Sequence, residues 1–216
     1  MIIAGIIDHD EKKMTINLIN SIFSLTGKKV GIVDSKDLIQ LDSTKIKNYF
    51  YELEKNKTDI LILKINVPDI YKEFFNFLHF DVMIFADKAD DLKEISDNKD
   101  FGALMDRVFL LMDDKGIIIV NVDDSEIIRF LKGVKYYTVT YGFNSKASIT
   151  TSSIGDDVYK ENFLCCLQRT ISAKNGSLIE PQEYRVKVAS NEFDAYSVLA
   201  AATFAIVNGI DLNAVE

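Results

Sequence analysis

Short, almost wholly apolar runs alternate with longer helical stretches through the first two thirds of the chain. Ile2 to Ile7 is the first such run, and later ones end at Asp34, Ile65, Ala86 and Asn121. Strands that are apolar at nearly every position are typical of a parallel sheet covered on both faces. The helical segments between them supply the crossover connections that parallel strands need. The pattern therefore predicts an α/β fold with a mostly parallel, helix-flanked sheet.

The predicted elements follow one another as strand, helix, strand. The strands are expected at 2–7, 29–34, 59–65, 81–86, 116–121 and 136–141, and the helices at 14–25, 44–55, 70–78, 101–112 and 126–131. From about Ala147 shorter alternating pieces at 148–152, 164–171 and 184–188 predict a small antiparallel β appendage. A helix over 195–208 follows. We therefore expect one domain, with a parallel core over 1–146, the appendage over 147–190 and a closing helix over 191–216.

The composition argues against a nucleic-acid partner and against membrane insertion. The 216 residues carry a net charge of −8 with lysine and arginine scattered, and an acidic protein repels a phosphate backbone. No segment approaches the roughly 18 unbroken apolar residues of a membrane span, and the N-terminus lacks the basic lead of a signal peptide. The adjacent Cys165 and Cys166 form no metal or disulfide motif and are expected to be reduced thiols. We therefore expect a cytoplasmic protein.

The loop after the first strand has the layout of a phosphate-binding loop but not its residues. Ligands of such sheets bind beyond the carboxyl ends of the strands. A phosphate loop needs internal glycines, a lysine and a magnesium-binding hydroxyl. Here Lys13 takes the place of the hydroxyl, and negative charge lies where phosphates would, on Asp8, Asp10 and Glu11. An ordinary acidic loop at a helix N-terminus would explain the same residues.

Six motifs occur in order along the chain, at Gly5–Thr15, Gly27–Ile32, Phe80–Phe85, Val120–Asp124, Tyr141–Ser145 and Asn191–Ala201. They resemble the stretches G-I-T-G-T-N-G-K-T-T-T, G-x-K-V-G, F-D-V-A-V-F, I-N-A-D-D, Y-G-x-N-S and G-x-F-N-V-Y-N-A-L-A-A of the Mur ligase family. The whole chain is similar to the central, ATP-binding domain of these cytoplasmic enzymes, which form the amide bonds of the peptidoglycan stem peptide. The resemblance implies the same fold. It also implies that the family's N-terminal substrate-nucleotide domain and C-terminal ligase domain are absent.

The resemblance also places altered residues at the family's catalytic positions. Lys64 stands for a magnesium-binding glutamate, Leu92 for a histidine beside the retained Asp91, and Met105 for a carbamylated lysine. Near the last helix, family asparagines become Asp194 and Ser197. The resemblance therefore implies no intact catalytic residue and no metal. A vestigial nucleotide site would consist of Lys12, Lys13, Thr15, Asn121 and Asp123, with Asp8, Asp10 and Glu11 filling the loop.

Two explanations of these changes are open. In the first, Asp8, Asp10 and Glu11 replace the phosphates, and Lys12, Lys13 and Lys64 replace the metal in an internal acid–lysine network. In the second, an unused site has drifted and its side chains are simply solvated.

We expect a catalytically inactive Mur ligase-like protein that acts as a binding or regulatory module linked to bacterial cell-wall synthesis. No cofactor is expected. A cell-wall synthesis enzyme is the first candidate partner, and a homodimer is the second. The aromatic run Phe74, Phe75, Phe77 and Phe80 is expected to lie in the core, and one side of this apolar segment also offers an interface. The alternative is an ATP- and magnesium-binding amide ligase domain that is residually active or completed by a partner chain. A third expectation is an unrelated role for a reused α/β scaffold. The two histidines, His9 and His79, are expected to be a loop residue and a partly buried structural residue.

Overall fold

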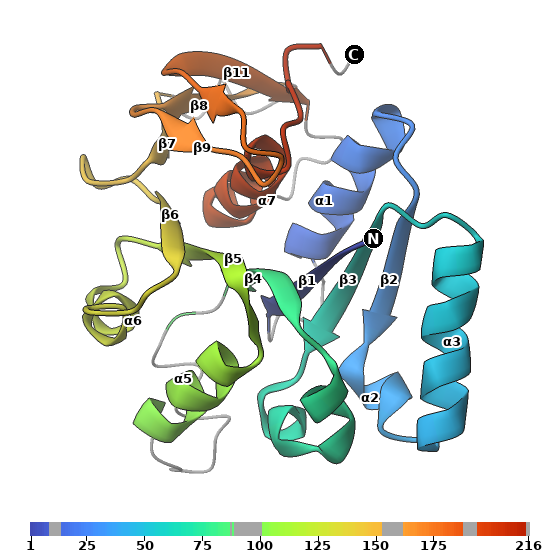
Figure 1. Ribbon diagram of the computed structural model, residues 1–216. Helices are drawn as coiled ribbons and strands as arrows, with labels where there is room; N and C mark the ends of the chain where they lie inside the picture. The colour runs from blue at the N-terminus through green and yellow to red at the C-terminus, as the bar shows by residue number, and fades with distance from the viewer. Residues whose placement is uncertain (9–13, 87, 89–100, 153–161, 188–193, 215–216) are drawn as a thin grey trace.

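The computed structural model describes residues 1–8, 14–86, 88, 101–152, 162–187 and 194–214. Its main feature is a nine-stranded sheet with the strand order β11-β8-β7-β6-β5-β4-β1-β3-β2, flanked by helices (Figure 1). A separate two-stranded sheet pairs β9 with β10. The predicted α/β fold class is therefore confirmed.

The elements lie close to their predicted positions. The strands are β1 (Ile2–Ile7), β2 (Val30–Asp34), β3 (Ile60–Ile65), β4 (Phe80–Phe85), β5 (Met112–Asn121), β6 (Tyr137–Tyr141), β7 (Ile149–Thr151), β8 (Asn162–Leu167), β9 (Ile171–Ser172), β10 (Leu178–Ile179) and β11 (Gln182–Lys187). The helices are α1 (Met14–Leu25), α2 (Ser35–Leu38), α3 (Ser43–Lys55), α5 (Phe101–Leu110), α6 (Ser125–Phe130) and α7 (Ala195–Val207), with short 3₁₀ helices η1 (Val67–Tyr71) and η2 (Glu73–Phe77).

The first strand lies inside the sheet. β1 pairs in parallel with β3 on one side, where Ile7 lies opposite Ile65, and with β4 on the other, where Ile7 lies opposite Phe85. β5 continues in parallel from β4, and β6 from β5. The residues that follow β1, β3, β4 and β5 therefore meet at one edge of the sheet, called here the carboxyl edge. The opposite edge, where these strands begin, is called the amino edge.

Two apolar clusters cover the two faces of the sheet. One contains α1 and α7, which pack together through Phe23 and Phe204 with ring centroids 5.4 Å apart (Figure 1). The other contains α5 and the segment of η1 and η2. Coverage of both faces explains why the parallel strands are apolar at nearly every position.

The antiparallel strands of the C-terminal third are also confirmed, and they continue the main sheet. β7 pairs in parallel with β6, and the antiparallel pairs β7–β8 and β8–β11 extend the sheet from there. Because β6 and β7 pair at only one residue, Tyr141 with Ile149, the parallel and antiparallel parts meet at a narrow junction.

The predicted helix over 70–78 is wrong, because this segment forms η1 and η2. Lys72, between them, has an extended backbone. The adjacent Phe74 and Phe75 are both buried while Phe77 is 62% exposed, so this segment does not bury one continuous helical face. His79, predicted to be partly buried, is exposed. The short helix α2 was not predicted, and β5 begins at Met112, earlier than expected.

Among the helices in the described part of the chain, none combines the length and the apolar character needed to cross a bilayer.

Candidate functional site

The two described ends of the predicted phosphate loop lie at the carboxyl edge. Asp8 follows β1 directly and is only 4% exposed, and Thr15, the second residue of α1, is 3% exposed. The other predicted loop residues, Asp10, Glu11, Lys12 and Lys13, lie outside the described residues, as does His9. The proposed acid–lysine network is therefore described only at Asp8 and Lys64.

Lys64 brings a positive charge to the carboxyl edge. It is the second-last residue of β3 and is half-buried. Its neighbours in register are Ile6 on β1 and Asp34 on β2. The residue predicted to replace a metal ligand is thus held by the sheet beside the strand that leads into the loop.

A buried polar network beside Lys64 was missed by the sequence reasoning. The Ser35 hydroxyl donates to Asp69 Oδ2 over 2.7 Å, and the Asn66 side chain donates to the same oxygen over 3.2 Å. The backbone N–H of Asn66 donates to Ser35 Oγ over 3.0 Å. Asp69 is 5% exposed and Ser35 is fully buried. These bonds tie the end of β2 to the end of β3, and the signal that could have revealed them is the polar residues directly after each strand.

Asp123 holds the loop between β6 and β7. Its two carboxylate oxygens accept the backbone N–H of Phe143 over 2.7 Å and that of Asn144 over 3.0 Å. The Tyr196 hydroxyl, from α7, donates to Asp123 over 3.2 Å. Burial, and after it the negative charge of Asp123, raises the pKa of Tyr196. The predicted nucleotide-site residue Asp123 is therefore already bonded to three groups of the chain itself.

The glycine of this loop is required for the contact. A Cβ on Gly142, whose φ is +148°, would lie 2.7 Å from Asp123 Oδ2. Asn121, at the end of β5, is 7% exposed, and its side-chain oxygen accepts the backbone N–H of Asp123 over 2.9 Å. Asn121 and Asp123 thus lie together at the carboxyl edge, as the sequence predicted.

Among the remaining predicted positions, the structure describes Met105, Asp194 and Ser197. Met105, on α5, is 1% exposed within an apolar cluster. Asp194 caps α7, accepting the backbone N–H of Ser197 over 2.9 Å and its hydroxyl over 3.2 Å. Asp91 and Leu92 lie outside the described residues. In the described part of the chain, no group of three or more His, Cys, Asp or Glu side chains is arranged to hold a metal ion.

The inner first strand, the helix behind its loop and the polar residues at the strand ends define an α/β domain of the phosphate-loop type. A family model of the Mur ligase middle domain matches residues 12–205, so the chain belongs to the Mur ligase middle domain family. The resemblance stated from the motifs is therefore confirmed.

Solved structures support the same fold. A UDP-N-acetylmuramoyl-L-alanyl-D-glutamate–2,6-diaminopimelate ligase superposes with a TM-score of 0.70 at 13% identity, over 100% of this chain and 45% of that one. A UDP-N-acetylmuramoylalanyl-D-glutamyl-2,6-diaminopimelate–D-alanyl-D-alanyl ligase from Acinetobacter baumannii gives a TM-score of 0.60 at 12% identity, over 100% of this chain and 46% of that one. E. coli FolC, solved with DHPP and ADP, gives 0.58 at 12% identity, over 99% and 57%. The chain therefore spans about half the length of these enzymes. A search of curated sequences finds no match.

Proposed function

We propose that this Mur ligase-type domain is a binding or regulatory module of bacterial cell-wall synthesis that does not itself catalyse amide ligation. In this proposal it acts in the cytoplasm, needs no nucleotide or metal, and binds a partner protein. An enzyme of peptidoglycan synthesis is the first candidate partner, because the family motifs are those of peptidoglycan ligases.

Lys64 is the observation that carries the proposal. The family chemistry makes an acyl phosphate from ATP, with magnesium stabilising the charge that develops. Lys64 lies at the carboxyl edge, where the resemblance implies a magnesium-binding glutamate. Exchange of a carboxylate for an ammonium group removes a ligand and adds a like charge beside the ion. At an effective dielectric of about 20 the repulsion amounts to several kcal/mol.

Asp8, Asp123 and Met105 support the same proposal. Asp8 places a buried carboxylate at the start of the loop, where it would repel a phosphate. Asp123 is bonded to the β6–β7 loop and to Tyr196. Met105 offers no amine for carbamylation and is enclosed by apolar side chains.

Thermal unfolding with ATP, ADP and magnesium tests the proposal. A ligand stabilises the folded state by RT ln(1 + [L]/Kd), or about 2.7 kcal/mol at a hundred times Kd, so micromolar binding would be conspicuous at millimolar nucleotide. We expect no shift in Tm. E. coli FolC, whose structure contains ADP, serves as the positive control. A saturable, magnesium-dependent rise in Tm would overturn the proposal.

One observation favours the second candidate, an ATP-binding amide ligase domain completed by a partner chain. The side-chain nitrogen of Asn121 makes no hydrogen bond to any described residue, while its oxygen is held by Asp123. That nitrogen is a donor at the carboxyl edge, where an adenine would lie in the family. If nucleotide raises the Tm, Asn121→Ala should weaken nucleotide binding, with Kd rising about tenfold because one hydrogen bond is lost.

A further inference from the structure

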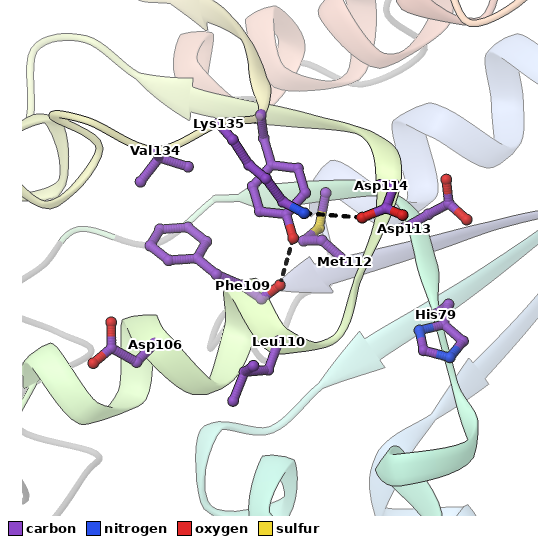
Figure 2. A pocket seen from close by; sticks show the side chains of 10 residues that line it. His79, Asp106, Phe109, Leu110, Met112, Asp113, Asp114, Val134 and Lys135 are labelled. Atoms are coloured by element: carbon purple, nitrogen blue, oxygen red, sulfur yellow. Dashed lines mark hydrogen bonds and ion pairs between the residues drawn. The ribbon is translucent and has the colours of Figure 1, made fainter.

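A cavity of about 800 Å³ opens at the amino edge of the sheet, the edge opposite to the candidate nucleotide site (Figure 2). It is lined by the last turns of α5, by residues just before β4 and β6, and by the first residues of β5. Its volume lies within the range of functional ligand pockets, about 300–1,000 Å³. None of the residues that carried the family resemblance at the carboxyl edge takes part in it.

The centre of the cavity is apolar and braced. The Tyr136 hydroxyl donates to the backbone oxygen of Phe109 over 2.8 Å, and the two rings lie 6.2 Å apart. This bond fixes the strand-side wall against α5. Leu110, beside it, is 73% exposed and also lines the cavity. A ligand with an apolar group would cover it and remove that surface from water.

The charged side chains of the cavity are predominantly acidic. Asp114 is paired with Lys135 over 2.9 Å, so this lysine does not neutralise the other carboxylates. Asp106 and Asp113 form no ion pair with any described residue. In Figure 2 they lie on opposite sides of Leu110. The cavity thus presents an exposed apolar side chain between two unneutralised carboxylates.

We propose that this cavity, the Leu110 pocket, docks a segment of a partner protein in which an apolar side chain lies between two basic ones. The inference rests on the proposed function as a binding module and names the surface that would bind. The net charge of −8 supports it, because the field of the whole chain attracts a basic segment and repels a second copy. Apolar burial of the central side chain would supply most of the affinity, and the two flanking charges the orientation.

A capped pentapeptide, acetyl-Lys-Ala-Leu-Ala-Lys-amide, is a minimal probe. Its binding to the full chain would be measured by calorimetry at physiological salt, with backbone amide NMR shifts reporting the location. We expect saturable binding with shifts confined to α5 and the residues before β4 and β6. The charge-inverted peptide with glutamate in place of lysine should not bind. Replacement of the leucine by serine should weaken binding.

Matched variants separate the pocket from the general charge of the chain. Asp106→Asn with Asp113→Asn removes both carboxylates, keeps an oxygen acceptor at each position, and should weaken binding about tenfold. Glu52→Gln with Glu54→Gln removes the same charge from exposed positions on α3 and should leave binding within about twofold. Leu110→Ser, at an exposed position that should fold normally, should also weaken binding.

Three results would overturn the proposal that the Leu110 pocket docks a basic segment. These are no binding at millimolar peptide, an equal loss in the α3 control, and binding of the acidic peptide with equal affinity. If the chain self-associates and Leu110→Ser abolishes this association, the occupant of the pocket is a second copy of the chain and not a basic segment. The nucleotide titration is independent of all these outcomes, so failure of the pocket and failure of the proposed function are distinguishable.

Discussion

At the scale of single residues, many aspartates in the described part of the chain bind its own backbone. Four helices, α2, α3, α6 and α7, begin after an aspartate whose side chain accepts a backbone N–H of the first turn. A carboxylate at this position satisfies an otherwise unbonded donor and interacts favourably with the helix dipole. Asp123 accepts two backbone N–H groups of the loop after β6 in the same way, whereas Asp69 accepts the side-chain donors of Ser35 and Asn66. Part of the acidic composition is therefore accounted for by structural bonds.

Asp123→Ala should destabilise the protein by about 0.5–1.5 kcal/mol, because three hydrogen bonds at an exposed carboxylate are replaced by bonds to water. Urea unfolding followed by circular dichroism would measure the change. Asp106→Ala is the control, since that exposed carboxylate pairs with no described residue, and it should stay within about 0.5 kcal/mol of the parent. Equal stability of the Asp123 variant would show that solvent replaces the carboxylate without cost.

At the scale of elements, the number of sides on which a helix is covered decides whether its sequence is amphipathic. α1 is amphipathic and was predicted with its observed bounds, 14–25. α7 is buried at every residue from Val198 to Val207, because α1 covers one side of it and the sheet another. The 70–78 segment was misread because aromatic residues of η1 and η2 resemble a helical face in sequence. Their burial depends on β4 and α5 instead.

Phe204→Ala should destabilise the protein by about 3–5 kcal/mol, because the fully buried ring fills the contact between α7 and α1 against Phe23. Chemical unfolding gives the measurement. The matched control is Leu25→Ala, on the same helix pair but 57% exposed, for which little change is expected. A loss below about 1 kcal/mol for Phe204 would mean that the two helices close over the cavity.

At the scale of the whole molecule, Lys174 joins the C-terminal third to the parallel core. Its ammonium group lies 2.9 Å from Asp81 Oδ1 and donates to the backbone oxygen of Lys115 over 3.2 Å. Asp81 in turn accepts the backbone N–H of Ile3 over 2.9 Å. The side chains of Lys174 and Asp81 are 18% and 25% exposed, so water screens the pair weakly. One ion pair thus links β1, β4 and β5 to the segment after β9.

A double-mutant cycle of Lys174→Met and Asp81→Asn should give a coupling energy of about 1–2 kcal/mol. The asparagine keeps an acceptor for Ile3, so the cycle isolates the charge pair. The Lys135–Asp114 pair has the same 2.9 Å separation but is 64% and 92% exposed, and it should show no measurable coupling. Equal coupling in the two cycles would refute the role assigned to burial.

The sequence alone determined the fold class, most element positions and the family, because these follow from local periodicity, turn residues and ordered motifs. It also placed Asn121, Asp123 and Lys64 at one edge, since the carboxyl ends of parallel strands meet there. Only the tertiary structure decided that Asp123 bonds the loop after β6, that Asp69 ties β2 to β3, and that the antiparallel strands continue the main sheet. The Leu110 pocket at the amino edge was likewise invisible in the sequence. Each of these depends on contacts between residues distant in the chain, and such contacts are set by packing rather than by local pattern.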